Sequence, residues 1–219
     1  MVEKYSTLTS QTWKQIQLFQ PPVYRYLDQK WIDEFLTTGR LLISSLRKFI
    51  KYPDEVRGDK NEGTAHYHTE LNGGSHFVSH LSSGISQYIF CTSLINSDEL
   101  KSDFGVDSCI RIFKPFEFTI AILNSIANSS GASYGLCNYQ DSRYVESMSE
   151  KSMVDVVDDF INFSGEQMGN GLDMLFLKEN KYQYQNEFRF VWDVNVPYDE
   201  LPENMIVECK EALKYCEQA

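Results

Sequence analysis

The chain has 219 residues, 42% of them hydrophobic, and is therefore long enough to bury one full core. Its net charge of −11 argues against broad, salt-driven adhesion to the phosphate backbone of a nucleic acid. No stretch approaches the roughly 18 apolar residues of a membrane span, and the N-terminus lacks the apolar run of a signal peptide. The five cysteines include no CxxC pair, which is typical of a reducing compartment. We therefore expect a cytoplasmic protein with no membrane partner.

The hydrophobic pattern predicts short strands and a few helices in a single domain over residues 1–219. The first elements are expected to be a helix over 13–19, a strand over 23–27, a helix from Asp28 to Gly39 and a strand over 41–43. The stretch 52–83 is polar and contains glycines, so we expect a long surface loop or flap there. The later elements are expected to be strands over 85–93 and 107–113, a helix over 116–126, paired strands over 132–147, a helix over 153–163, strands over 174–177 and 186–194, and a C-terminal helix over 202–219. Because strands and helices do not alternate regularly, the pattern indicates an α+β fold with antiparallel sheet.

Three polar groups fall on three separate predicted strands. They are, in chain order, Arg25, the hydroxyl pair Thr92 and Ser93, and the Gln-x-Glu motif formed by Gln185 and Glu187. An arginine, a hydroxyl-bearing strand and a Gln-x-Glu motif in this order resemble the ADP-ribosyltransferase superfamily. The resemblance implies two small, mainly antiparallel sheets around an NAD cleft, with flanking helices.

The resemblance also implies a role for each residue. Cleavage of the nicotinamide–ribose bond of NAD builds positive charge on the ribose, and Glu187 would be the carboxylate that stabilises this charge. Tyr24 and Arg25 are expected to bind the cofactor, with the guanidinium on the phosphates of NAD. Thr92 and Ser93 are expected to support the glutamate and the nicotinamide ribose. The second motif departs from the family pattern, because it reads Cys-Thr-Ser instead of Ser-Thr-Ser.

The residues before the glutamate bear on the acceptor. Side chains two apart on a strand share a face, so Gln185 is expected beside Glu187, where the family contacts its acceptor. Relatives with glutamine at this place modify amide side chains and nucleobases. Tyr182 and Tyr184 are suited to stacking on a base. We therefore expect a mono-ADP-ribosyltransferase with an RNA, DNA or protein acceptor, nucleic acid being favoured. Such a protein would act as a toxin or phage-defence effector, with an antitoxin or inhibitor as a further partner.

Two other functions fit the sequence. All four histidines fall in the predicted flap, namely His66, His68, His76 and His80. With Asp59 or Glu62 they would supply a zinc site for a metal-dependent hydrolase or nuclease, although no HExxH or cysteine-rich pattern is present, so the leading interpretation has no metal. The other alternative is a non-catalytic acidic inhibitor or interaction protein, for which the net charge of −11 is the argument.

Overall fold

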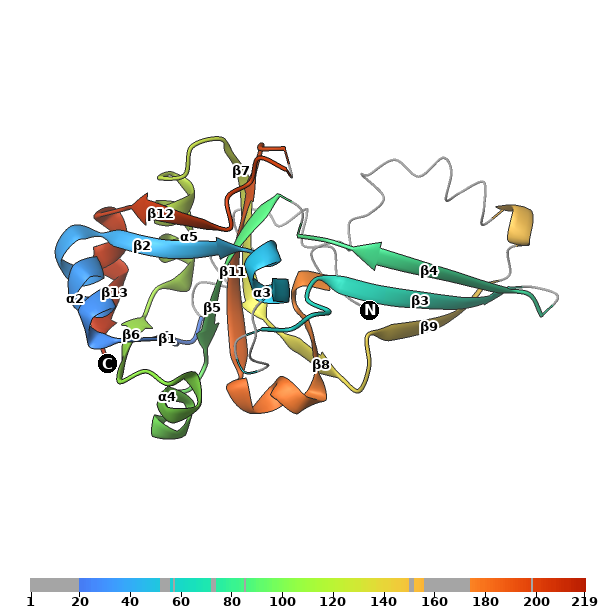
Figure 1. Ribbon diagram of the computed structural model, residues 1–219, viewed down its shortest axis with the longest axis horizontal. Coiled ribbons are helices and arrows are strands. Elements are labelled where there is room, and N and C mark those ends of the chain that lie inside the picture. The colour runs from blue at the N-terminus through green and yellow to red at the C-terminus, as the bar shows by residue number, and fades with distance from the viewer. Residues whose placement is uncertain are drawn as a thin grey trace.

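The computed structural model describes residues 20–51, 56, 58–71, 74–84, 86–149, 152–155, 174–197 and 199–219. The helix expected over 13–19, and most of the one expected over 153–163, lie outside these ranges. Within them the fold is α+β, with one large antiparallel sheet, two small sheets and few helices, as Figure 1 shows. The predicted α+β class with antiparallel sheet is confirmed. No helix among the described residues is long and apolar enough to cross a membrane.

The largest sheet has eight strands, which run in the order β12-β2-β5-β1-β6-β13, with β11 paired to β5 and β7 paired to β11. Their bounds are β1 (Val23–Leu27), β2 (Arg40–Ser45), β5 (Gln87–Ser93), β6 (Ser108–Ile112), β7 (Ser129–Leu136), β11 (Glu187–Val194), β12 (Asn204–Glu208) and β13 (Cys216–Gln218). The two small sheets contain β8 (Asn138–Gln140) with β10 (Leu177–Glu179), and β3 (Thr64–Leu71) with β4 (His76–Ser82) and β9 (Tyr144–Ser149). The helices are α2 (Gln29–Thr38), α3 (Leu46–Lys51), α4 (Asp98–Phe104) and α5 (Pro115–Leu123), with 3-10 segments η3 (Asn180–Gln185) and η4 (Glu211–Tyr215).

The large sheet forks at β5. Ser93 pairs with Tyr24 of β1 and also with Glu187 of β11, so β1 and β11 lie on opposite edges of β5. Ile89 pairs with β2 and again with β11, so β2 shares the edge that β1 occupies. On this edge, β2 therefore pairs with the first part of β5, and β1 pairs with the last residue of β5. The two strands diverge between these points, and this divergence creates the setting of the site described below.

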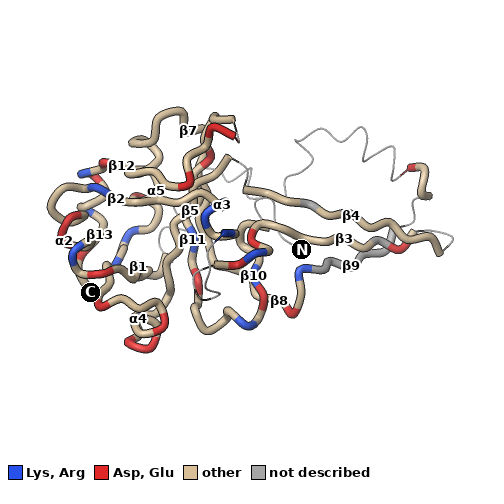
Figure 2. Tube along the Cα trace, viewed as in Figure 1, with Lys and Arg blue, Asp and Glu red and all other residues tan. Residues whose placement is uncertain are grey.

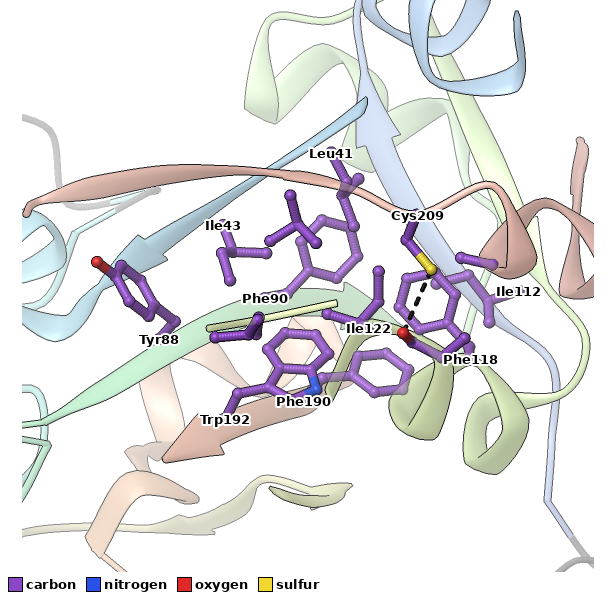
Figure 3. Packing of buried hydrophobic residues seen from close by; sticks show 14 of the residues in the cluster. Leu41, Ile43, Tyr88, Phe90, Ile112, Phe118, Ile122, Phe190, Trp192 and Cys209 are labelled. Atoms are coloured by element: carbon purple, nitrogen blue, oxygen red, sulfur yellow. Dashed lines mark hydrogen bonds between the residues drawn. The ribbon is translucent and has the colours of Figure 1, made fainter. Parts of the chain in front are cut away.

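The main core lies on one face of the strand β11. Phe190 and Trp192 are fully buried there and pack with Phe90 and Phe118, as the close view in Figure 3 shows. The few polar atoms are satisfied: the indole nitrogen of Trp192 donates to the carbonyl of Thr119 at 3.1 Å. Burial of large aromatic side chains, at about 25 cal/mol per Å² of apolar surface, is the main term that stabilises this sheet.

The helix predicted from Asp28 to Gly39 is confirmed. Ile32 and Phe35 are spaced three apart and are both buried, as the amphipathic pattern requires. The helix ends at Gly39, whose φ of 77° is left-handed and whose amide donates to the carbonyl of Phe35. A Cβ at this position would lie 2.8 Å from backbone atoms of Cys209, so the close approach of the two segments needs glycine.

The prediction of a loop over 52–83 is wrong for most of the described residues in that range. Residues 64–71 and 76–82 form the antiparallel pair β3 and β4, and β9 joins β3 in parallel register. Together they make an arm that projects away from the large sheet in Figure 1. Gly74, between the two strands, takes a left-handed φ of 75°. Composition suggested a loop because the strands are rich in Ser, Thr and His, whereas their period-2 pattern was the better signal.

The C-terminal helix expected over 202–219 is also wrong. The segment contains β12, the short 3-10 turn η4 and β13. Strand β12 pairs with β2, and β13 pairs with β6. Val207 is buried while Ile206 is 54% exposed, and this alternation is that of a half-buried strand. The strand expected over 174–177 is wrong except for its last residue, because Met174 and Leu175 are helical and β10 begins at Leu177. The pair of strands expected over 132–147 is instead β7, β8 and part of β9, which pair with β11, β10 and β3 respectively.

Candidate functional site

One cavity of about 270 Å³ lies where β1, β5 and β11 meet. Its lining includes the residues that the sequence placed on three distant segments, namely Arg25, Thr92, Ser93, Gln185 and Glu187. The fork of β5 accounts for their meeting, because Ser93 is in register with Tyr24 on one edge and with Glu187 on the other. These pairings bring the heads of two strands and the end of a third to one place.

Glu187 is held between two cations at the head of β11. Its Oε2 accepts a hydrogen bond from Lys178 Nζ at 2.6 Å, and its Oε1 accepts one from Arg189 Nε at 2.6 Å. Burial alone would raise the pKa of this carboxyl, but Arg189 and Lys178 hold it well below its usual range. Glu187 raises the pKa of Lys178 above its ordinary value, against the lowering effect of burial. The site therefore contains a buried, ionised and oriented carboxylate.

The ionic cluster extends beyond this pair. Arg189 also donates to Glu62 Oε1 at 2.7 Å and to the carbonyl of Leu175. Next to it, Arg143 donates to Asp59 Oδ2 at 2.5 Å. Asp59 and Glu62 had been considered as oxygen ligands of a metal, but both are buried in these ion pairs. Sequence reasoning missed Arg143 altogether, because its partners lie far away in the chain.

Lys178 is the second residue that the sequence did not single out. It lies on β10, which pairs in parallel with β8, and its ammonium group reaches Gln185 Oε1 at 3.0 Å as well as Glu187. It also lies 4.6 Å from the centroid of the Tyr182 ring. The position of this lysine directly after the apolar run from Met174 to Leu177 was the signal that could have revealed it.

The two hydroxyls of the second motif fix the backbone around Glu187. Thr92 Oγ1 donates to the carbonyl of Phe188 at 2.7 Å, and Ser93 Oγ donates to the carbonyl of Gln185 at 2.7 Å. The amide of Glu187 donates to Tyr139 Oη at 2.8 Å. We expected these hydroxyls to support the glutamate. Among the described residues they do so through hydrogen bonds to main-chain carbonyls on either side of it. Rigid backbone on both sides of the carboxylate limits where that group can point.

Gln185 does not lie on the strand, contrary to the period-2 prediction. It ends the 3-10 segment η3, and Asn186 then turns the chain with a left-handed φ of 44° before β11 begins. The side chain is buried, and its Nε2 donates to the carbonyl of Val56 at 2.9 Å. Because its Oε1 accepts from Lys178, both ends of the amide are engaged.

Arg25 lines the cavity from β1. One guanidinium nitrogen donates to the carbonyl of Cys91 at 2.7 Å, on the stretch of β5 between its pairings with β2 and β1. The guanidinium carbon lies 4.7 Å from the ring centroid of Phe90. Tyr24, expected to bind the cofactor with Arg25, instead packs beside Tyr26 on the other side of the strand and is not in the cavity lining.

The two tyrosines expected to stack on an acceptor differ in exposure. Tyr182 is buried, and the ammonium groups of Lys178 and Lys181 lie over its ring, so it offers no free face for stacking. Tyr184 is 44% exposed, and its hydroxyl lies 3.3 Å from Gln185 Nε2. The period of the short 3-10 segment places these residues on different sides, although both were expected to stack on a base.

Charge and aromatic character distinguish the cavity from the rest of the chain. Among the described lining residues, four side chains are basic and three are acidic: Arg25, Lys48, Lys178 and Arg189, against Asp28, Glu62 and Glu187. This balance contrasts with a net charge of −11 for the whole chain. Figure 2 shows blue and red segments close together around β10, β11 and α3. Aromatic side chains also line the cavity, among them Trp31, which is 51% exposed.

The four histidines lie outside this cavity, on the β3–β4 arm. His66 and His80 are register partners, with their Nδ1 atoms 3.3 Å apart, and the rings of His68 and His76 stack at 5.0 Å. Among the described residues, no group of three or more His, Cys, Asp or Glu side chains is arranged to hold a metal ion. The three-ligand zinc centre that a metal-dependent hydrolase needs is therefore not formed in this part of the chain.

No protein-family model matches the chain, and neither a curated protein nor a solved structure matches it. The chemistry of the site consequently has to be argued from its geometry. It combines an ionised carboxylate, guanidinium and ammonium groups, and aromatic rings around a small cavity. Such a set can bind an anionic ligand that carries a flat ring, and it can stabilise positive charge that develops next to the carboxylate.

Proposed function

We propose that the chain is a mono-ADP-ribosyltransferase that binds NAD in this cavity and transfers ADP-ribose to a macromolecular acceptor. The observation that carries the proposal is the convergence of the arginine, hydroxyl and Gln-x-Glu segments on one cavity. These segments were selected from the sequence by their order alone, and nothing in that order requires them to meet in space. Perturbed ionisable groups in a cavity are also a general mark of functional sites.

In this proposal Glu187 stabilises the oxocarbenium-like ribose. An ionised carboxylate has about four lone-pair positions. The two cations that hold the carboxylate, Arg189 and Lys178, each donate one hydrogen bond to a different oxygen. The carboxylate can thus accept a ribose hydroxyl without losing either cation. Because its charge and direction are already fixed, little reorganisation is needed when positive charge develops on the sugar.

The cavity accommodates part of a dinucleotide. Its volume of about 270 Å³ is near the lower end of small-molecule sites, which span roughly 300–1,000 Å³. We assign it to the nicotinamide and its ribose, with the phosphates toward Arg25 and Lys48. The exposed ring of Trp31 supplies a stacking surface at the rim. The fork of the sheet at β5 supports a cleft between two diverging parts, as the ADP-ribosyltransferase fold requires.

For the acceptor, the exposed ring of Tyr184 favours a nucleobase over a protein side chain. It adjoins Gln185, and stacking on an aromatic ring contributes about 1–3 kcal/mol per base. The net charge of −11 argues against a nucleic-acid partner. The described cavity lining, however, has one more basic than acidic side chain, which weakens that argument. We therefore take RNA or DNA as the acceptor class, with protein as the alternative outcome of the test.

The test is incubation of the purified chain with NAD labelled in the adenylate half and a cell lysate. We expect label in macromolecules that nuclease removes and protease leaves. A matched pair of variants separates the site from general effects. Glu187→Gln combined with Lys178→Met removes one buried charge of each sign, whereas Glu179→Gln changes a glutamate outside the cavity.

Transfer should be lost in the first variant and kept in the second. Label that disappears with protease would assign the acceptor to protein. If the wild-type chain neither binds NAD nor transfers label, the ADP-ribosyltransferase proposal is wrong, and a non-catalytic interaction protein becomes the better interpretation.

A further inference from the structure

The histidine pair on the β3–β4 arm has the geometry of two ligands. His66 and His80 are direct partners across the antiparallel ladder, so their side chains emerge on the same face. Their Nδ1 atoms are 3.3 Å apart, and the ring centroids are 4.5 Å apart. His80 is exposed and His66 is half-buried, so an ion in solvent can reach the pair.

The distance between the nitrogens is informative. Zinc binds histidine nitrogen at about 2.0–2.1 Å with tetrahedral angles, which places two such nitrogens roughly 3.3–3.4 Å apart. At this distance the two nitrogens either share a hydrogen bond, in which the tautomer decides which ring donates, or both ligate one metal ion. The observed spacing of 3.3 Å matches the nitrogen–nitrogen distance of a tetrahedral zinc site.

We propose that His66 and His80 form a two-imidazole site for a borderline divalent transition-metal ion such as Zn²⁺. Imidazole nitrogen is a preferred ligand for this class of ion and a poor one for Mg²⁺ or Ca²⁺. His80 is exposed, which leaves room for water at the remaining coordination positions. Among the described residues no third side chain completes the set, so this part of the chain supplies two ligands.

The bound ion would link β3 to β4 across the ladder. It would therefore stabilise the arm in the manner of any ligand that binds only the folded state. This role is independent of ADP-ribose transfer, since the pair does not line the cavity that contains Glu187.

The same hairpin provides a matched control. His68 and His76 are stacked with ring centroids 5.0 Å apart, but they are not direct register partners, because His76 pairs with Glu70 and His68 with Val78. The double substitution His68→Ala with His76→Ala removes as much imidazole from the same face as His66→Ala with His80→Ala. Only the latter pair removes the proposed ligands.

The experiment is a Zn²⁺ titration by calorimetry on the untagged full chain, after treatment with a chelator, with circular dichroism to verify folding. We expect one Zn²⁺ per chain, and affinity at least about tenfold lower in His66→Ala and in His80→Ala, because each imidazole is half of the protein's ligand set. The His68/His76 variant should bind like the wild type. Cu²⁺ should bind more tightly than Zn²⁺. The proposal is overturned if the wild type takes up no stoichiometric Zn²⁺, or if the control variant loses affinity equally.

Discussion

The two faces of β11 use one strand for two different purposes. On one face Phe188, Phe190 and Trp192 pack into the main apolar core. On the other, Glu187 and Arg189 are buried in a cluster of ion pairs. Apolar burial stabilises the fold directly, whereas buried charges must recover a desolvation cost through their mutual attraction and gain little net stability. The comparison teaches that the charged face is better explained by a function than by folding.

The largest loss of stability is expected on the apolar face. Phe190→Ala should lower the free energy of unfolding by about 3–5 kcal/mol, because the fully buried ring leaves a cavity among other aromatic side chains. Urea denaturation measures the effect. Leu42→Ala, at an exposed position on β2, is the control and should change stability by no more than about 0.5 kcal/mol. Similar values for the two variants would contradict the assigned core.

On the charged face, stability should depend on balance more than on any one residue. Glu187→Gln alone leaves Lys178 without its carboxylate partner and Arg189 with Glu62 alone, and we expect a loss of about 3–5 kcal/mol. Adding Lys178→Met removes the excess charge and should restore most of that loss. Urea denaturation of the wild type, the single and the double variants decides the matter. If the single variant is as stable as the wild type, the clamp around Glu187 does not exist in solution.

Cofactor binding should respond to the shape of one cation. Arg25→Lys keeps the charge but loses the two-pronged donor, so we expect NAD affinity to fall by about 1–3 kcal/mol. Calorimetry with NAD measures the change. Arg111→Lys on the neighbouring strand β6 is the control, because Arg111 pairs with Glu217 at 2.6 Å and does not line the cavity. Equal effects of the two substitutions would remove Arg25 from the binding site.

The two faces should also differ in their response to pH. The pKa of Glu187 is lowered in the folded chain, so its contribution to stability is present above the ordinary carboxyl pKa of about 4.3. That contribution is lost as the pH falls below this value toward the folded pKa. The slope from one such group is at most about 1.4 kcal/mol per pH unit.

Denaturation at several pH values checks this prediction. The Glu187→Gln/Lys178→Met variant should lack that part of the acid slope. Phe190→Ala should keep it, since the aromatic face contains no group that titrates in this range. An unchanged slope in the double variant would mean that other carboxyls account for the acid sensitivity.

Local patterns predicted much of this molecule. The helix from Asp28 to Gly39 and the strand of Glu187 follow from apolar spacing and from the residues at the ends of each element. The arm and the C-terminal strands were missed, because their pairing partners are distant in the chain and their composition is polar or helix-like. The order of the three motifs in the chain identified five residues of the cavity lining, namely Arg25, Thr92, Ser93, Gln185 and Glu187. Lys178 and Arg143 were not identified, since only the tertiary structure brings them to the cluster.

The most direct test of the central claim is the release of nicotinamide from NAD in single turnover, because this step needs the carboxylate but not the acceptor. The wild type should release nicotinamide. The Glu187→Gln/Lys178→Met variant should do so about 10²–10³-fold more slowly, as expected for loss of the preorganised carboxylate. Its folding should be verified by circular dichroism and its NAD affinity by calorimetry. Equal rates in the two proteins, or no release by the wild type, would contradict the assignment of Glu187 as the group that stabilises the ribose cation.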